Sequence, residues 1–467
     1  MTDWTIASLA AAIRARRISP VEATQECLAR VARLDGRLRA FITVDADGAL
    51  ARARALEAEV AAGRWRGPLH GVPLAHKDLF HIGGLPTSCG TKTAEYFFAE
   101  RDATAVARLI EAGANTLGKL NMAELALGPF GDNAHHGDAQ NPWRAGHVSG
   151  GSSSGSGVAV AVGLALGALG TDTGGSIRLP AACCGIVGLK PTYGRVSRAG
   201  AMPLSWAMDH IGPMARTVAD VALMLEVIAG PDPADATSSA REVPGYLAEL
   251  ERPPAGLRVA LPENYYLDGV SAEVAAATRD ALAAFERLGA RVASIRLPDP
   301  QVIHDVSSII ARAESSAVHS RVLRERPHEL QPAVRARLAV GTRISAHDYL
   351  QALRLRARLA RDFNEEVFAE ADLLILPAIP EPAPALADAT AGEGETIAAR
   401  MGRFSRLTRP WNGLGLPALA LPCGFAASGL PLGLQIVGRP FDEATVLRAG
   451  HAYEGATEWH RRRPSLD

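Results

Sequence analysis

The chain has 467 residues, of which 48% are hydrophobic and 21% are charged, and its 49 basic and 50 acidic side chains nearly cancel. This balance gives no global field that would point to nucleic acid or to an acidic membrane surface, and the hydrophobic content is sufficient for a large core. The five cysteines form no C-x-x-C pair and no H-E-x-x-H segment occurs, which argues against a disulfide framework and against a metal enzyme.

The first residues of the chain and its longest apolar run indicate the cellular compartment in which the protein is expected. The segment MTDWTIASLAAAIRARR lacks the basic region that opens a signal peptide, and residues 158–169 are too short for a membrane span. The few scattered thiols fit a reducing compartment. We therefore expect a cytoplasmic protein with no membrane partner.

The first 65 residues predict a helical section without evident chemistry. Residues 5–34 read as two amphipathic helices, which Ser19 and Pro20 separate as an N-cap and a first helical position. Residues 46–62 predict a third helix, rich in Ala, Arg and Glu. This section is expected to serve packing.

A short apolar segment, residues 71–80, then carries Lys77 beside Asp78. One interpretation is a solvated lysine at a strand end that forms a salt bridge with Asp78. The other is a partly buried lysine whose pKa is lowered, so that it can act as a neutral base. The pair alone does not decide between them.

Two Gly/Ser-rich turns, residues 150–157 and 170–177, occupy the centre of the chain, and the apolar residues 158–169 between them predict a buried helix. Glycine allows the backbone to approach a ligand closely, and successive free N–H groups form a nest for a negative oxygen. A serine in such a nest is a nucleophile if a base lies nearby. After these turns we expect a buried run and turn at 183–193 and a loop at 195–212.

Two other interpretations of the first turn are weaker. A phosphate-binding loop would need a lysine next to its last glycine, and none is present. The segment Gly151-Ser152-Ser153-Ser154-Gly155 matches G-x-S-x-G with Ser153 as nucleophile, but that elbow requires a strand directly before it. Residues 141–147 read instead as a loop.

The second half of the chain predicts a layered α/β architecture. Proline, aspartate and serine cluster at 231–254, which makes this segment the best candidate linker. Residues 303–370 read as helical and rich in arginine, with solvated basic faces. The remaining expected elements are strands at 257–262, 291–295, 372–377, 418–422 and 433–437 and helices at 272–288 and 443–453, with the later strands joining the same sheet as the earlier ones.

Three segments together resemble the amidase signature family of serine hydrolases: GVPLAHKD (71–78), GGSSSGSG (150–157) and GTDTGGSIRLPAACCGIVGLKPTYGRVS (170–197). Supporting matches extend the resemblance over nearly the whole chain. It implies a single α/β/α domain, residues 1–467, in which helices cover a large mixed β-sheet. Within this domain, residues 1–65 are the N-terminal helical section, 66–230 the catalytic core, and 255–467 the remainder of the sheet with its covering helices.

The resemblance also implies a Ser–cis-Ser–Lys triad. Ser176 would be the nucleophile, Ser152 the bridging serine after a cis peptide bond, and Lys77 the base, which must be neutral to accept a proton. Ser152 would carry the proton from Ser176 to Lys77 and return it to the leaving amine. The main-chain N–H groups of Thr173, Gly174, Gly175 and Ser176 would form the oxyanion hole.

Five further residues are candidates for substrate contact: Ala126, Leu127, Gly128, Ser153 and Arg178. The residues at 126–128 match a stretch that lines the acyl pocket in the family. Ser153 has an alternative role in supporting Ser152 through a hydrogen bond. For Arg178 we favour a structural ion pair with Asp172, and the alternative is contact with an anionic substrate.

The implied function is hydrolysis of a carboxylic amide through an acyl-enzyme, with aryl amides, carbamates and esters open to the same chemistry and with no metal or organic cofactor. The expected partner is a small-molecule amide substrate, with no nucleic acid and no membrane, and a homodimer is left open. One alternative is the glutamine-hydrolysing A subunit of a tRNA-dependent amidotransferase, ranked second because no Arg-Tyr-Asp-Gly-like segment occurs around 315–326. The other is a non-catalytic binding protein, against which an intact triad argues.

Overall fold

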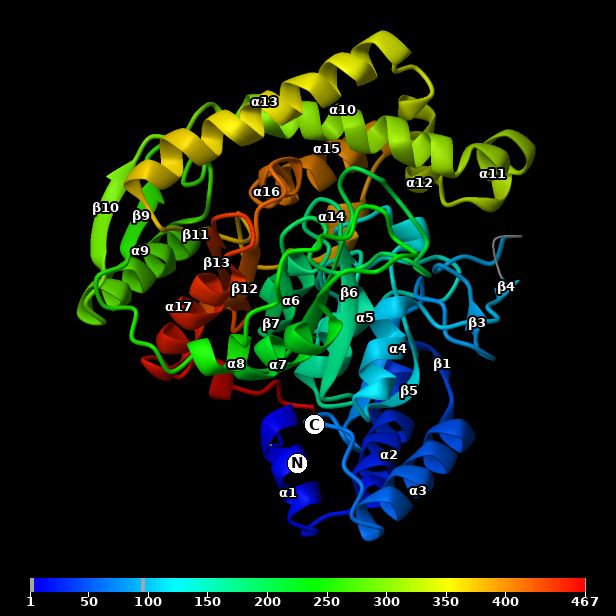
Figure 1. Cartoon of the computed structure of the whole chain (residues 1–467). Coiled ribbons are helices and arrows are strands. Elements are labelled where there is room, and N and C mark those ends of the chain that lie inside the picture. The colour runs from blue at the N-terminus through cyan, green and yellow to red at the C-terminus, as the bar shows by residue number, and fades with distance from the viewer. Residues whose placement is uncertain (1–3, 94–96, 467) are drawn as a thin grey trace.

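A mixed sheet of eleven strands forms the centre of the computed structural model, which describes residues 4–93 and 97–466 (Figure 1). The strand order is β1-β5-β2-β6-β8-β7-β12-β13-β11-β9-β10. The strands are β1 (Phe41–Val44), β2 (Pro73–Lys77), β5 (Asn115–Leu120), β6 (Gly167–Asp172), β7 (Val187–Lys190), β8 (His210–Ala215), β9 (Arg258–Pro262), β10 (Arg291–Ile295), β11 (Leu373–Pro377), β12 (Ala418–Phe425) and β13 (Pro431–Gly438). A separate ribbon pairs β3 (Pro86–Thr87) with β4 (Phe97–Phe98).

Pairing in the sheet is parallel toward its two sides, apart from the antiparallel outer pair of β1 and β5, and antiparallel across its middle. The strand β2 runs parallel to both β5 and β6, and β9 runs parallel to β10 and β11. From β6 through β8, β7, β12 and β13 to β11, each neighbouring pair is antiparallel. The five strands expected in the second half are confirmed, and they join the same sheet as the earlier strands.

Helices cover both faces of this sheet, as an α/β/α architecture requires. Successive residues of β12 alternate between two hydrophobic clusters: Leu419 and Leu421 belong to one, and Ala420 to the other. Because side chains alternate across a strand, the two clusters lie on opposite faces. The first cluster includes residues of α1, α4, α7, α9 and α17, and the second includes residues of α2, α5 and α6. The expected fold class is confirmed.

The helices on the first face are α1 (Ile6–Arg14), α4 (Thr104–Glu111), α7 (Val218–Ile228), α9 (Ala272–Arg287) and α17 (Glu443–Gly455). Those on the second face include α2 (Pro20–Leu38), α3 (Ala46–Ala61), α5 (Ser154–Ala161) and α6 (Arg178–Cys184). The break expected between the first two helices is confirmed, because Ser19 caps α2 in a capping box with Glu22 and Pro20 is its first residue. Within the described residues, no helix has both the length and the apolar character that a bilayer crossing requires.

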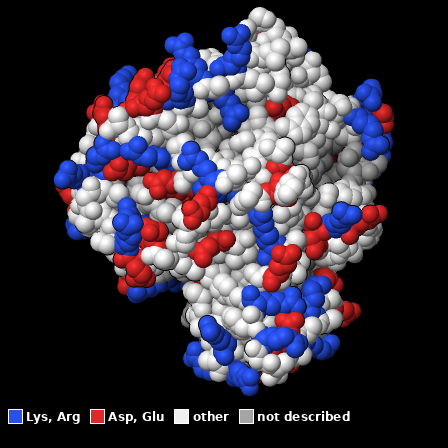
Figure 2. Space-filling model, in the orientation of Figure 1, with Lys and Arg blue, Asp and Glu red and all other residues white. Residues whose placement is uncertain are grey.

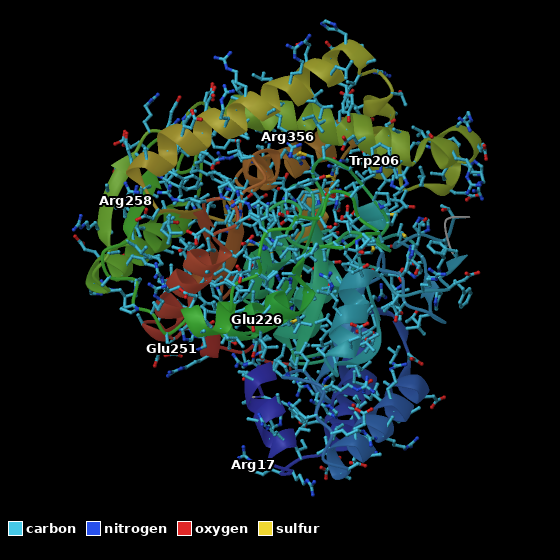
Figure 3. The ribbon with its side chains drawn as sticks, viewed as in Figure 1. Arg17, Trp206, Glu226, Glu251, Arg258 and Arg356 are labelled. Atoms are coloured by element: carbon cyan, nitrogen blue, oxygen red, sulfur yellow. The ribbon has the colours of Figure 1, made fainter. Side chains whose placement is uncertain are left out.

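A third group of helices lies at the top of Figure 1, over one end of the sheet. Its two longest members, α10 (Pro300–Val318) and α13 (Ala346–Glu370), pack along each other. Arg356 of α13 donates from Nε to the Gly413 carbonyl oxygen at 2.7 Å, and the loop that carries Trp206 lies below α10 (Figure 3). The remaining members are α11 (Ser320–Glu325), α12 (Pro332–Gly341), α15 (Gly394–Phe404) and α16 (Arg409–Gly413), whereas α14 (Leu386–Thr390) lies nearer the middle and packs with the second-face cluster.

Two expectations for the middle of the chain were wrong in part. The helix expected at 158–169 ends at Ala161; the chain turns at Gly163, whose φ is 68°, and then enters β6. A run of small apolar residues has no clear period, so it does not distinguish a buried helix from a buried strand. The expected loop at 195–212 runs into β8. The run expected at 183–193 is buried as predicted, and it contains the end of α6 and all of β7.

The segment 231–254 does not separate two sheets, since strands before and after it belong to the same one. It contains a short helix, α8 (Tyr246–Glu249), and Tyr246 is fully buried. On the face drawn in Figure 2, basic and acidic side chains are interspersed, in agreement with a net charge near zero.

Candidate active site

Lys77 and Ser152 meet at the sheet end where β2 stops and the first Gly/Ser turn begins. The Nζ atom of Lys77 donates to Ser152 Oγ at 2.7 Å and to Thr171 Oγ1 at 2.8 Å. Both Lys77 and Ser152 are fully buried, and the Gly151–Ser152 peptide bond is cis. Residues 75 positions apart in the sequence are thus held in direct hydrogen-bond contact.

Lys77 is not the solvated partner of Asp78. The Asp78 carboxylate pairs instead with Lys119, whose Nζ lies 3.0 Å from Oδ1. Burial lowers the pKa of Lys77 to about 7, and the negative charges of Asp209 and Asp172 offset only part of this effect. A lysine with such a pKa is largely uncharged just above neutrality, which is the state that a proton acceptor needs.

Ser176 follows β6 in a loop that the Asp172 carboxylate shapes. Asp172 accepts the N–H groups of Gly175 at 2.7 Å and of Ile177 at 3.2 Å. Gly175 has a φ of 132°, and a Cβ there would lie 2.3 Å from Thr408 Oγ1, so only glycine fits this position. The loop therefore presents Ser176 from a backbone that is fixed on both sides.

Ser153 connects the two Gly/Ser turns through the main chain. Its N–H donates to the Ser176 carbonyl oxygen at 3.3 Å. Its Oγ hydrogen-bonds the carbonyl oxygen and the N–H of Thr171, each at 3.3 Å. The fully buried Ser153 side chain supports the backbone under the site and is absent from the cavity wall described below.

The four N–H groups expected in the oxyanion hole do not have the same environment. The Gly175 N–H is engaged by Asp172, which differs from the expectation for this residue. In the described part of the chain, no acceptor bonds the N–H groups of Gly174 and Ser176. The Thr173 side chain donates to Asp209 Oδ1 at 2.6 Å, which fixes the start of the loop.

Arg178 forms a structural ion pair, as favoured above. Its Nη2 lies 2.9 Å from Asp172 Oδ1, and both side chains are fully buried. All five of its N–H donors are used, since the others reach Thr408, Gln435 and Asn412. Burial alone would raise the pKa of Asp172, but Arg178 and its other partners lower it. Contact between Arg178 and an anionic substrate is therefore not supported.

A cavity of about 340 Å³ opens beside Ser176. Ala126, Leu127 and Gly128, three of the candidate substrate-contact residues, form part of its wall. The rest of the wall comes mainly from α10, α12 and α15 and from Arg409. The cavity thus connects the expected nucleophile with the helices at the top of Figure 1.

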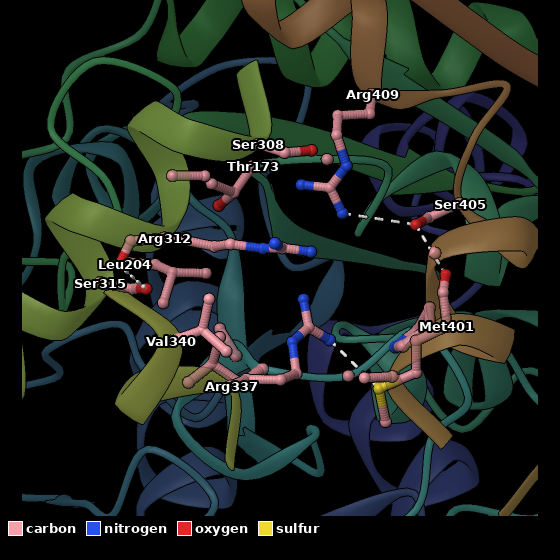
Figure 4. Close-up of a pocket in the computed structure, with 18 of the residues that line it drawn as sticks. Thr173, Leu204, Ser308, Arg312, Ser315, Arg337, Val340, Met401, Ser405 and Arg409 are labelled. Atoms are coloured by element: carbon pink, nitrogen blue, oxygen red, sulfur yellow. Dashed lines mark hydrogen bonds between the residues drawn. The ribbon is translucent and has the colours of Figure 1, made fainter. Parts of the chain in front are cut away.

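Four arginines line this cavity, and none of them was recognised from the sequence; the exposed Arg343 follows α12, and the other three reach further in. Arg312 and Arg337 come from the arginine-rich region that was interpreted as a solvated basic face, and Arg409 is the first residue of α16. Figure 4 shows all three side chains reaching into the cavity. Only the packing of three distant helices brings them together, and the sequence contains no local signal of that packing.

Asn412 and Asp209 were also missed. Asn412 donates from Nδ2 to the Asp172 carbonyl oxygen at 2.9 Å and accepts from Arg178 at 2.7 Å. Asp209 accepts the Thr173 hydroxyl and the N–H groups of Leu204 and Ser205. Both residues hold the loop that precedes Ser176.

Comparison with known proteins gives a consistent family relationship. The amidase family model matches residues 22–447. The A-type subunit of the glutamyl-tRNA(Gln) amidotransferase of Chloroflexus aurantiacus is 42% identical over 99% of this chain and 98% of its own length. A chain from a vestigial protein complex, whose structure bears on the origin of an s-triazine catabolic enzyme, is 34% identical with a TM-score of 0.90, covering 97% of this chain and 98% of that one. The peptide amidase of Stenotrophomonas maltophilia is 33% identical with a TM-score of 0.87, and the match covers 100% of this chain and 99% of that one.

The first of these relatives corrects the partner prediction. We expected a small-molecule amide substrate and no nucleic acid, whereas a relative 42% identical over nearly the whole chain is named as one subunit of an enzyme for glutamyl-tRNA(Gln). The expectation failed because serine, lysine and an oxyanion loop cleave an amide in the same way whether the ammonia is released to water or passed to another subunit. The catalytic segments carry no information about the acceptor.

Proposed function

The chain belongs to the amidase family, and on that premise we propose that it releases ammonia from glutamine through a Ser176 acyl-enzyme, as the A-type subunit of a tRNA-dependent amidotransferase. Enzymes of this family act on carbon–nitrogen bonds. The observation that carries the proposal is the buried contact between Lys77 and Ser152, whose neighbour Ser153 is hydrogen-bonded to the main chain of Ser176, in a chain so similar to a known amidotransferase component.

In the first half of the proposed reaction, neutral Lys77 accepts the Ser152 hydroxyl proton while Ser152 accepts that of Ser176. Ser176 Oγ then attacks the amide carbonyl carbon and the carbonyl oxygen becomes an oxyanion. We assign the stabilisation of this oxyanion to the N–H groups of Thr173, Gly174 and Ser176, of which those of Gly174 and Ser176 have no other acceptor in the described part of the chain.

In the second half, the proton returns through Ser152 to the amide nitrogen as the carbon–nitrogen bond breaks and ammonia leaves. A water molecule attacks the acyl ester, giving its proton to Ser152 and Lys77. When the ester bond breaks, the proton returns to Ser176 Oγ and the carboxylic acid is released. No net proton remains on Lys77, so the triad is ready for another substrate.

Ammonia release from glutamine tests this proposal, measured with the chain alone and with the other subunits of a tRNA-dependent amidotransferase. We expect release that requires Ser176 and that increases when the other subunits and charged tRNA are added. Release by the Ser176→Ala variant at the rate of the unmodified chain would refute the acyl-enzyme.

A second candidate is hydrolysis of another carboxylic amide, an aryl amide, a carbamate or an ester. The sequence around 315–326, which lacks an Arg-Tyr-Asp-Gly-like segment, and the likeness to a peptide amidase favour it. Ser176-dependent turnover of these substrates, together with no turnover of glutamine under any condition, would select this candidate.

A further inference from the structure

Four arginines line the cavity, and three of them reach toward its centre without a carboxylate partner, whereas the fourth, Arg343, is exposed to solvent. The guanidinium groups of Arg312, Arg337 and Arg409 enter from α10, α12 and α16 and are turned toward its centre (Figure 4). In the described part of the chain, none of them forms an ion pair. Arg337 Nη1 contacts Met401 Sδ at 3.2 Å, and Arg409 Nη2 donates to Ser405 Oγ at 3.4 Å.

This arrangement is unfavourable for the protein alone. Burial, together with repulsion within the cluster, lowers the pKa values of Arg337 and Arg409 to about 10. Both remain charged at neutral pH, and the buried Nε atom of Arg409 has no hydrogen-bond acceptor among the described residues. Arg337 and Arg409 are half-buried, whereas Arg312 is exposed. Removing a cation from water is costly unless an anion compensates it, so the two half-buried groups favour a negatively charged ligand, and Arg312 adds to the positive charge at the site.

Acidic residues compensate little of this charge. Asp132 acts on Arg337 from beyond ion-pair distance, and burial raises the pKa of Asp132 itself. Glu395 is the acidic residue of the cavity wall, and its side chain is exposed to solvent. The four arginines of the wall against Glu395 and Asp132 leave an excess of two positive charges when both carboxyl groups are ionised.

The cluster belongs to the same cavity as the expected nucleophile. A Cβ placed on Gly174 would lie 3.2 Å from Arg409 Cζ, so this guanidinium lies against the loop that leads to Ser176. Arg312 and Arg337 lie on the helices that form the other walls. An acyl group bound to Ser176 would therefore extend among the three arginines.

We propose that the cavity selects amides whose acyl part carries two carboxylates and no ammonium group. This inference rests on the proposed cleavage at Ser176 and revises its donor, because an amide with two carboxylates would be preferred to glutamine. Glutamine supplies one carboxylate to the arginines, but its ammonium would lie in a positively charged cavity whose described wall offers no buried acid. Guanidinium groups bind carboxylates through paired, charge-assisted hydrogen bonds, so a second carboxylate should be more favourable than the ammonium.

A series of primary amides on one carbon chain tests the proposal. Glutaramide is neutral, glutaramate has one carboxylate, glutamine adds an ammonium, and 3-carboxyglutaramate has two carboxylates. We expect kcat/KM to rise ~10-fold or more with each carboxylate and to be lower for glutamine than for glutaramate. Added salt should reduce the differences, since it screens charge.

Binding to the Ser176→Ala variant, measured by calorimetry with the same four amides, gives a readout that does not require turnover. Arg312→Gln and Arg337→Gln should each weaken binding of 3-carboxyglutaramate ~10-fold or more and change that of glutaramide little. Arg335→Gln is the matched control, because Arg335 is an exposed residue of the same helix α12 outside the cavity wall. Thermal melting shows whether each variant is folded.

The outcomes separate this inference from the proposed function. Equal affinities for glutaramide and 3-carboxyglutaramate, or a folded pair of arginine variants that bind the dianion as well as the Arg335→Gln control does, would overturn the inference while leaving amide cleavage intact. Graded binding without Ser176-dependent turnover of any amide would support the anion site and refute the cleavage.

Discussion

Lys77 Nζ lies 2.7 Å from Ser152 Oγ, and no part of either residue is exposed to solvent. The hydrogen bond joins the end of one strand to the turn that precedes α5. It aligns a lysine of lowered pKa with a hydroxyl group that can relay a proton. Four predictions concern this contact, the serines near it, the ion pair below it and a carboxyl group far from it.

The first prediction concerns pH. Since the pKa of Lys77 is about 7 and its neutral form is the proton acceptor, kcat/KM should rise as the pH passes upward through 7 and then level off. Below pH 6 it should fall about tenfold per pH unit. Initial rates with a saturating and a dilute amide between pH 5 and 9 provide the test, and a flat profile would remove Lys77 as the base.

The second prediction compares serines of the two turns. Ser176→Ala and Ser152→Ala should each reduce kcat by at least ~10³-fold, because one removes the nucleophile and the other the proton relay. Ser154→Ala is a matched control: Ser154 is also fully buried, and its Oγ has no hydrogen-bond partner among the described residues. Steady-state rates of the three variants decide the matter, and equal losses in all three would indicate a structural effect.

The third prediction concerns the ion pair under the nucleophile loop. Asp172→Asn leaves Arg178 charged and fully buried and weakens the bonds to Gly175 and Ile177, so it should lower the free energy of unfolding by about 3–5 kcal/mol. Denaturant unfolding measures this loss. Asp362→Asn, which removes a surface pair with Arg358, should leave the midpoint almost unchanged. Similar midpoints for the two variants would contradict the assignment.

The fourth prediction links pH to stability through Glu454. Burial, assisted by the negative charge of Asp220 and opposed by the hydrogen bond from the Val218 N–H, raises the pKa of this carboxyl group from 4.5 to about 8. A raised pKa favours the folded state below pH 4.5, and this contribution is lost as the pH rises through 8. Tm should therefore fall between pH 6 and pH 9.

In Glu454→Gln this fall should be smaller, because the amide stays neutral and keeps an oxygen for the Val218 N–H. Glu458→Gln, at an exposed position, is the control and should retain the fall of the unmodified chain. Parallel Tm curves for Glu454→Gln and the unmodified chain would show that Glu454 does not titrate in this range.

Much of the fold could be predicted because its strands are apolar runs bounded by turns. The segments DLLILP, ALALP and GLQIV gave strands whose described side chains are buried on both faces. The segment 158–169 misled because alanine, glycine and valine in succession show neither a helical nor a strand period. Pairing with β2 and β8, which are distant in sequence, determines that its end is a strand.

In the active site, too, some features could be predicted from the sequence and others could not. The buried lysine and the serine turn could be predicted from local segments of the sequence. The hydrogen-bond environment of each main-chain N–H group in the loop before Ser176 could not. The Gly175 N–H turns to Asp172 because of the loop conformation, and a glycine-rich sequence is compatible with either orientation. The arginine cluster depended on the packing of α10, α12 and α16, so arginine content alone suggested only a solvated surface.

The groups assigned to bond breaking all lie between residues 77 and 176, on strand ends and tight turns, whereas the arginines come from helices after residue 300. The selection of a substrate by its charge and the cleavage of its amide bond thus depend on different parts of the chain. Mutation of the exposed turns of α10 and α12 can alter which acids are accepted without disturbing the sheet that holds the lysine. For evolution, and equally for directed libraries, this separation offers a route to new substrates at constant chemistry.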